Sequence, residues 1–275
     1  MNRLDHLTRQ LEPGDGHAAH GRRPSVVPYV TAGDGGWRST VEVLHGIEAA
    51  GAVAVELGMP HSDPVADGPI LQQAAARALR SGFSFADFER CVAQYRSEGG
   101  SLGIVAFGYA NVLLEAHGRA GLARLERAGV DGIAIADLPF EEASELREAA
   151  RSLDLGTVFF AAPNTSRARL EALADAATGF VYALARRGTT GRATAIDSTL
   201  KDHLALVRAA SSHTLLAVGF GLTSRADIDR LRGHCDLAVV GSALVEYVHR
   251  ERAIGRDVRT AARRFVARLV EPAPS

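Results

Sequence analysis

Eight short apolar runs alternate with amphipathic patterns along this sequence, and that alternation constrains the fold more than any other feature. The strand-like runs are Val26–Val30, Ala52–Val55, Leu102–Phe107, Gly132–Ala136, Thr157–Phe160, Phe180–Leu184, Thr214–Val218 and Leu237–Val240. Most of them are apolar throughout, which is typical of parallel strands buried on both faces. The regular repeat of strand and helix predicts an α/β protein with a (β/α)8 barrel, or TIM barrel, rather than a doubly wound sheet.

Apolar residues at helical spacing fill the segments between these runs. The predicted helices are Leu4–Leu11, Trp37–Ala50, Ile70–Arg80, Phe85–Ser97, Val112–Ala128, Glu141–Ser152, Arg167–Ala176, Leu200–Ala210, Arg225–Arg232, Ala243–Arg250 and Val258–Val270. The second βα unit therefore contains an extra helix, and the first helix is suited to plug one end of the barrel. We expect one domain over residues 1–275, with a barrel core at 25–250, an N-terminal helix and loop at 1–24, and a C-terminal helix and tail at 251–275.

Charge and cysteine content exclude several classes of partner. Lys and Arg number 31 and Asp and Glu 32, so the formal net charge of −1 favours neither nucleic acid nor an acidic membrane surface. The sequence has no apolar run long enough for a membrane span and no apolar signal region near its start. Cys91 and Cys235 are far apart and are predicted to be buried thiols in a reducing compartment. The expected location is the cytoplasm.

The stretch Ala52–Pro69 carries the strongest functional signal. Glu56 ends the second apolar run, and the loop that follows it contains Asp63 and Asp67. A carboxylate at the end of a buried strand costs desolvation free energy that packing does not explain, which predicts a polar site there. The alternatives are that Glu56 pairs with a buried arginine, that Asp67 caps the next helix and that Asp63 is a turn residue.

Glycines follow the last three strands of the predicted barrel. Gly219 and Gly221 form a Gly-Phe-Gly turn after the seventh strand, Gly241 and Ser242 open the helix after the eighth, and Gly191 lies in the loop after the sixth. Glycines allow close approach of the backbone, and the N–H groups at a helix N-terminus attract anions. Barrels often bind phosphate at this place, so these residues predict a phosphate site.

Motifs in the same order along most of the chain resemble the tryptophan synthase α subunit. They are VVPYVTAGD, ELGMPHSDPVADGP, YAN after the third strand, ADLP after the fourth, the RxGTTG loop, GFG and GS. The resemblance implies cleavage of indole-3-glycerol phosphate to indole and glyceraldehyde 3-phosphate, without a metal or an organic cofactor. It also implies that indole passes through a tunnel to a partner β subunit, which is a pyridoxal-phosphate enzyme.

The resemblance also implies roles for individual residues. Glu56 corresponds to the general acid/base, and Asp67 to the partner of the indole nitrogen. Substrate contacts fall on Tyr29, Tyr109, Tyr182 and Thr190, although Tyr109 and Tyr182 could equally be core residues, and Pro60, His61, Asp63 and Asn111 fall on partner-facing loops. The chemistry agrees, because breaking the carbon–carbon bond requires a proton at the indole C3 and a second carboxylate to stabilise charge on the ring nitrogen.

Three single positions and the segment NVLLEAHG after the third strand depart from the family pattern, and other functions stay open. His61 replaces a phenylalanine, Gly35 a proline and Thr189 a valine, all on loops that face the partner or close the site. A stand-alone lyase that releases indole would need the same residues. A catalytically silent activator of a β subunit would not need both carboxylates. A phosphosugar isomerase would place an acid after the fifth strand, where this sequence has Ala161–Asn164.

Overall fold

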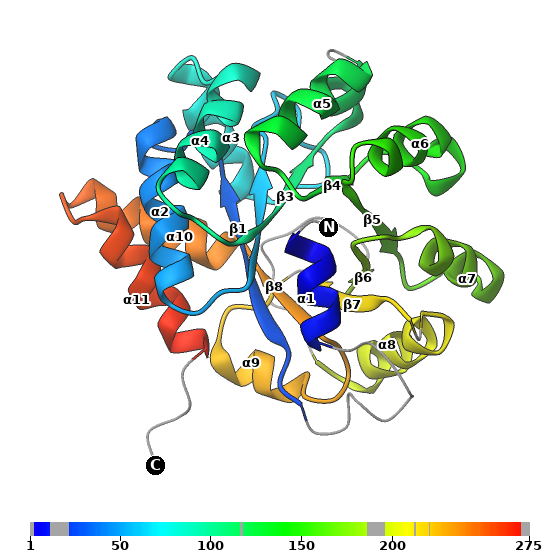
Figure 1. The fold of residues 1–275 in the computed structure, drawn as a ribbon. Coiled ribbons are helices and arrows are strands. Elements are labelled where there is room, and N and C mark those ends of the chain that lie inside the picture. Colours follow the sequence, from blue (N-terminus) through cyan, green and yellow to red (C-terminus); the bar gives the residue numbers. More distant parts are fainter. Residues whose placement is uncertain are drawn as a thin grey trace.

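A closed barrel of eight parallel strands in chain order forms the centre of the molecule (Figure 1). The computed structural model describes residues 3–11, 22–115, 118–185, 196–211, 213–219 and 221–270. The strands are β1 (Ser25–Thr31), β2 (Ala54–Gly58), β3 (Gly103–Gly108), β4 (Gly132–Ile135), β5 (Gly156–Ala161), β6 (Phe180–Leu184), β7 (Leu215–Gly219) and β8 (Leu237–Val240). The predicted (β/α)8 fold is therefore confirmed.

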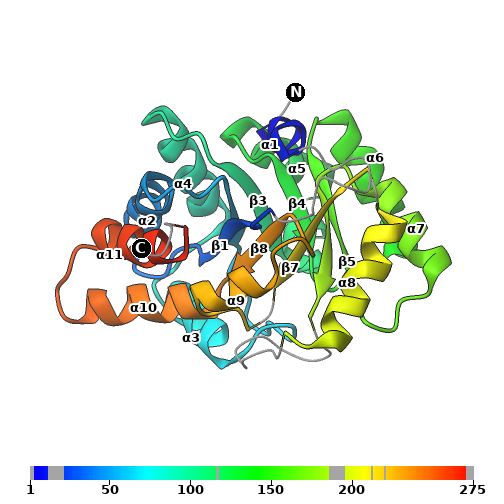
Figure 2. The same cartoon turned by 90° about the horizontal axis from the view of Figure 1, so that it is seen from below.

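Helices surround the barrel on its outside, except for the first helix, which lies across one end of it (Figures 1 and 2). They are α1 (Arg3–Leu11), α2 (Trp37–Ala49), α3 (Pro69–Arg80), α4 (Phe85–Ser97), α5 (Gly118–Ala128), α6 (Ser144–Ser152), α7 (Arg167–Ala176), α8 (Ser198–Ala210), α9 (Arg225–Arg230), α10 (Ser242–Ala253) and α11 (Val258–Val270), with a π-helix at Asn111–Glu115 and a 3₁₀ turn at Phe140–Glu142. The extra helix of the second unit is confirmed as α3. None of the helices within the described ranges combines the length and apolar character needed to cross a bilayer.

Alternating side chains divide the core into an inner and an outer layer. Along β2, Ala54 belongs to the cluster inside the barrel, whereas Val55 and Leu57 belong to the cluster between the barrel and its helices. Because successive side chains of a strand point to opposite faces, Glu56 is directed into the barrel. The two cysteines are buried and free, as predicted.

Two boundaries differ from the sequence prediction near the mouth of the barrel. The second strand was expected to stop before Glu56, but β2 continues to Gly58, so this glutamate lies within the strand. An apolar run ends at the first polar residue, whereas a strand ends where its backbone ladder ends. The helix expected over Val112–Ala128 is instead divided into the π-helix at Asn111–Glu115 and α5.

The N-terminal helix α1 closes the end of the barrel opposite the mouth, and this prediction is confirmed. Its residues Leu4, Leu7 and Leu11 are buried with the inner cluster. Glycines at the start of neighbouring strands make room for Leu4, since a Cβ atom at Gly132 would lie 2.6 Å from its methyl group. Leu4 of α1 thus fills the space at the barrel base that glycines at the starts of the strands leave open.

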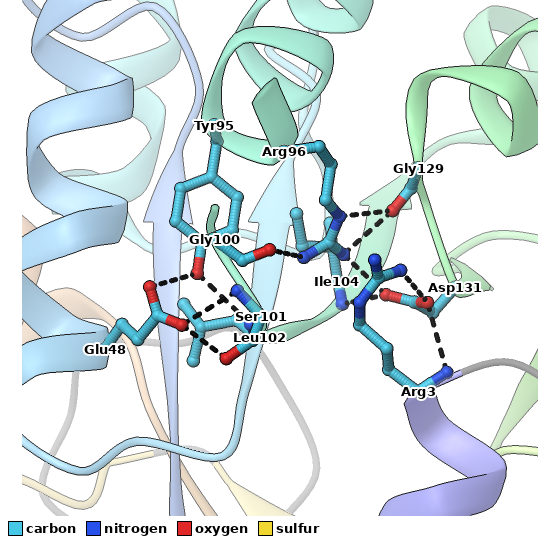
Figure 3. Close-up of polar contacts among 10 residues, drawn as sticks. All are labelled: Arg3, Glu48, Tyr95, Arg96, Gly100, Ser101, Leu102, Ile104, Gly129 and Asp131. Atoms are coloured by element: carbon cyan, nitrogen blue, oxygen red, sulfur yellow. Dashed lines mark hydrogen bonds and ion pairs between the residues drawn. The ribbon is translucent and has the colours of Figure 1, made fainter. Parts of the chain in front are cut away.

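A buried polar cluster holds α1 against the barrel base (Figure 3). The backbone N–H and the guanidinium of Arg3 donate to Oδ1 of Asp131 over 3.2 and 3.1 Å. Its Oδ2 accepts from Arg96 on α4 at 2.7 Å and from the backbone N–H of Ile104 at 2.8 Å. One carboxylate therefore joins α1, α4 and the start of β3.

We expect the substitution Asp131→Asn to lower the free energy of unfolding by about 3 kcal/mol, because it leaves Arg96 buried without its charged partner. Chemical denaturation measures this loss. The matched control is Arg167→Gln, which breaks an exposed ion pair with Glu171 on α7 and should change stability by less than about 1 kcal/mol. Equal stability of the two variants would contradict a supporting role for this cluster.

Candidate active site

A cavity of about 820 Å³, counted to its open mouth, lies at the carboxyl ends of the strands. Its wall is formed by Tyr29, Glu56, Asp67, Ile70, Leu71, Phe107, Tyr182, Gly221, Leu222, Thr223, Val239, Gly241, Ser242, Ala243 and Glu246. The lining thus brings both predicted catalytic carboxylates together with the glycine turn and the start of α10.

Glu56 is the most buried acidic group of this wall. Its side chain is 2 % exposed, and its Oε1 is buried without a hydrogen-bond partner among the described residues. Tyr29 lies beside it in register on β1. No arginine of the described ranges pairs with Glu56, so nothing there supports the alternative of a buried ion pair.

Asp67 reaches the cavity from the loop between β2 and α3. The residue is 5 % exposed, and α3 starts at Pro69 with Gly68 as its N-cap and without a side-chain cap. The helix-capping alternative for Asp67 is therefore not observed. Two hydrogen bonds hold the loop in place: the N–H of Ala66 donates to the hydroxyl of Tyr109 at 3.0 Å, and the Gln72 amide donates to the Asp67 carbonyl at 2.9 Å.

Burial raises the pKa values of both carboxyl groups. The pKa of Glu56 rises to about 8 and that of Asp67 to about 7, in each case through desolvation. Both groups therefore hold a proton at a higher pH than exposed carboxyl groups do. Two carboxyl groups with pKa values raised towards neutral pH, in one cavity, are suited to acid–base chemistry.

Aromatic rings line the inner part of the cavity. The ring of Phe107 lies edge-on to that of Tyr29, with centroids 5.6 Å apart, and edge-on to that of Phe160 at 6.2 Å. Phe160 in turn packs against Tyr182 at 5.3 Å. Burial raises the pKa values of Tyr29 and Tyr182, so their hydroxyl groups stay protonated. Such a wall suits a flat aromatic ligand.

The predicted phosphate residues divide into three groups. Gly221, Gly241 and Ser242 line the cavity, and Gly221 has a φ of +86°, which favours glycine. Gly219 does not line the cavity: it ends β7, and a Cβ atom there would overlap the hydroxyl of Tyr182. Gly191, like the predicted substrate residue Thr190, lies outside the described residues.

Tyr109 and the partner-facing residues surround the mouth rather than the cavity. Tyr109 is buried and accepts a hydrogen bond from the Ala66 N–H of the Asp67 loop. Its ring packs against that of His61, with centroids 4.7 Å apart. Asp63 and Asn111 are exposed, whereas Pro60 is buried and offers no surface to a partner. Val65, which was not among the predicted site residues, is 63 % exposed and presents an apolar side chain on this loop.

Several cavity residues were missed in the sequence analysis. Phe107 could have been found, because alternation along its strand places it inside the barrel. Leu222 and Thr223 follow the predicted glycine turn directly. Glu246 carries no sequence signal, since it reaches the cavity only because the first turns of α10 pass beside the mouth.

The fold and the site together define a (β/α)8-barrel protein with acid–base groups at the carboxyl ends of its strands. The sequence model of the tryptophan synthase alpha chain family matches residues 17–271. This chain belongs to that family. It is 36 % identical to the tryptophan synthase alpha chain of Bordetella parapertussis over 88 % of this chain and 85 % of that one. The Geobacillus stearothermophilus alpha chain is 37 % identical, over 87 % and 89 %.

Solved structures agree with this assignment. A chain from the tryptophan synthase α2β2 complex of Pyrococcus furiosus superposes with a TM-score of 0.81 at 35 % identity, over 91 % of this chain and 99 % of that one. The alpha subunit from Legionella pneumophila gives a TM-score of 0.84 at 28 % identity, over 98 % and 97 %. The resemblance seen in the motifs is therefore confirmed.

Proposed function

We propose that this protein cleaves indole-3-glycerol phosphate to indole and glyceraldehyde 3-phosphate as the α subunit of a tryptophan synthase. The observation that carries the proposal is the placement of Glu56 and Asp67 in one cavity whose lining also includes aromatic rings and the Gly241–Ser242 turn. The indole ring packs against these aromatic rings, and the phosphate lies at the N-terminus of α10.

The reaction is a retro-aldol cleavage. Protonated Glu56 delivers a proton to C3 of the indole, which makes this carbon tetrahedral. The bond from C3 to the side-chain carbon then breaks as the hydroxyl on that carbon loses its proton and becomes the aldehyde. Glu56 accepts that second proton, so the group ends the cycle in its starting form. Asp67 accepts a hydrogen bond from the ring N–H and stabilises the positive charge that develops there.

The partner in this proposal is a β subunit that consumes indole. The exposed side chains of Asp63, Val65 and Asn111 at the mouth support docking over the opening of the cavity. We further propose a cytoplasmic location and a single domain over residues 1–275, since α11 packs on α2 and so joins the end of the described chain to the barrel.

Incubation with indole-3-glycerol phosphate, with indole and glyceraldehyde 3-phosphate as the measured products, tests the activity. The assay is run with and without a tryptophan synthase β subunit. Cleavage that accelerates on addition of the β subunit supports the proposal. Full activity without any acceleration would identify a stand-alone lyase, and no cleavage in either condition would leave a catalytically silent activator.

The phosphate site makes a separate prediction. The substitution Ser242→Glu places a negative charge at the N-terminus of α10, and we expect the KM for the phosphorylated substrate to rise about 10- to 100-fold, the equivalent of one or two charge-assisted hydrogen bonds. Steady-state kinetics measures it. Ser144→Glu makes the same change at the exposed start of α6 and serves as the control. An unchanged KM for Ser242→Glu would exclude phosphate from this place.

A further inference from the structure

Asp34 is an acidic residue outside the cavity lining, in the turn that follows β1. Arg77 of α3 donates two hydrogen bonds to its carboxylate, from Nε at 2.9 Å and from Nη2 at 2.7 Å. Arg252 of α10 donates a third at 2.7 Å, and its other nitrogen donates to the Asp34 carbonyl. We refer to Asp34, Arg77 and Arg252 as the Asp34 clamp.

The clamp is sheltered from solvent and stays charged. The side chain of Asp34 is 9 % exposed, and those of the two arginines are largely covered. Burial by itself raises the pKa of Asp34, but the hydrogen bonds from Arg77 and Arg252 outweigh it and lower the pKa below its ordinary value. Paired charges of this kind are screened far less by salt than exposed ones, and two-point contacts fix orientation as well as distance.

The clamp connects the two helices that begin at the cavity, α3 and α10. Helix α3 begins two residues after Asp67, and α10 begins at Ser242. The two helices pack on each other and on β1, and Figure 2 shows both on the lower side of the molecule. A shift of one helix against the other would therefore change the spacing between the carboxylate of Asp67 and the start of α10.

A glycine in the turn after β1 leaves space for the side chain of Arg252, which comes from α10. Gly35 has a φ of +100°, and a Cβ atom on it would overlap the guanidinium of Arg252. A proline, whose ring holds φ near −65°, could not adopt the backbone conformation of this turn. The departure at Gly35, which was predicted to affect partner docking, thus lies where the guanidinium of Arg252 contacts the turn.

We propose that Asp34 is a positioning residue, which sets the spacing between Asp67 and the phosphate site so that one substrate reaches both. It touches neither end of the substrate and acts through α3 and α10. This inference rests on the proposed function, because it takes the indole and phosphate subsites as given.

The test distinguishes a change in the spacing between the two subsites from a change in the affinity of either subsite alone. Calorimetry compares wild type with Asp34→Asn for indole alone, for inorganic phosphate alone and for indole-3-propanol phosphate, an uncleavable analogue that joins the two. We expect unchanged affinities for the separate ligands. The Kd of the joined analogue should rise about 10- to 100-fold, because the benefit of linking two groups depends on matching their span to the sites.

Asp131→Asn provides the matched control. It also removes a buried carboxylate held by two arginines, but at the opposite end of the barrel. If it weakens the joined analogue as much as Asp34→Asn does, the effect is one of general stability and the inference is wrong. An unchanged Kd in Asp34→Asn also overturns the inference, and leaves the proposed function intact.

Two further arms complete the design. If Asp34→Asn does not yield folded protein, Arg252→Gln removes only the α10 arm and must show the same selective loss for the joined analogue. Wild-type protein that binds neither indole nor the joined analogue would contradict the proposed function, and this inference with it. The two failures are therefore distinguishable.

Discussion

The substitution Glu56→Gln should lower the turnover of indole-3-glycerol phosphate about 10²- to 10⁴-fold, the usual contribution of a positioned acid–base group. Glutamine keeps the size and shape of the side chain but cannot deliver a proton to C3 or accept one from the hydroxyl. The measurement is steady-state formation of indole. Near-normal turnover in this variant would show that the general acid/base has been assigned wrongly.

Stability as a function of pH provides the control for that variant. Burial raises the pKa of Glu56 from 4.5 to about 8, so the folded protein holds a proton that the unfolded chain releases. The stabilisation by this protonated group is fully present below pH 4.5 and is lost as the pH rises towards 8. Glu56→Gln should therefore be more stable than wild type at alkaline pH and similar to it at acidic pH. A loss of activity accompanied by greater stability cannot result from unfolding.

The substitution Asp67→Asn should lower turnover about 10²- to 10³-fold, comparable to the removal of one preorganised group that stabilises transition-state charge. An amide can still accept a hydrogen bond from the ring N–H, but it does not offset the positive charge on the ring. Because the pKa of Asp67 is about 7, wild-type kcat/KM should rise with pH through this value. The rise should be absent in the variant.

Asp63→Asn is the matched control, since it makes the same change on the same loop at an exposed position. We expect its turnover without a partner subunit to equal that of wild type. If Asp67→Asn also retains normal turnover and the same pH profile, Asp67 supports only the loop. Its burial would then serve the contact of that loop with Tyr109 rather than the reaction.

Much of the fold followed from short-range patterns. The ends of β6 and β8 agree with the predicted runs, because these strands are apolar from one end to the other. The prediction stopped β2 too early, because Glu56 interrupts its apolar run while its backbone continues in the ladder. Patterns of apolar residues therefore locate strands well except where a strand carries a functional polar residue into the barrel.

The candidate site was predictable in part. Glu56 and Asp67 were selected from a single stretch of sequence because strand ends in a parallel barrel converge on one mouth. No sequence pattern indicates that Gly219 lies against the hydroxyl of Tyr182 rather than in the predicted phosphate site, or that Pro60 is buried. These placements depend on which neighbour a side chain meets after the barrel closes.

By itself, the sequence determined the number and order of the strands, the plug helix and the two carboxylates of the cavity, because each of these is encoded within one contiguous stretch. Only the tertiary structure decided the Asp34 clamp, whose partners lie 43 and 218 positions away along the chain. The tertiary structure likewise decided which residues from different strands and helices line the cavity together. Closing the barrel brings the first and last strands together, and no local pattern specifies which side chains then meet across that junction.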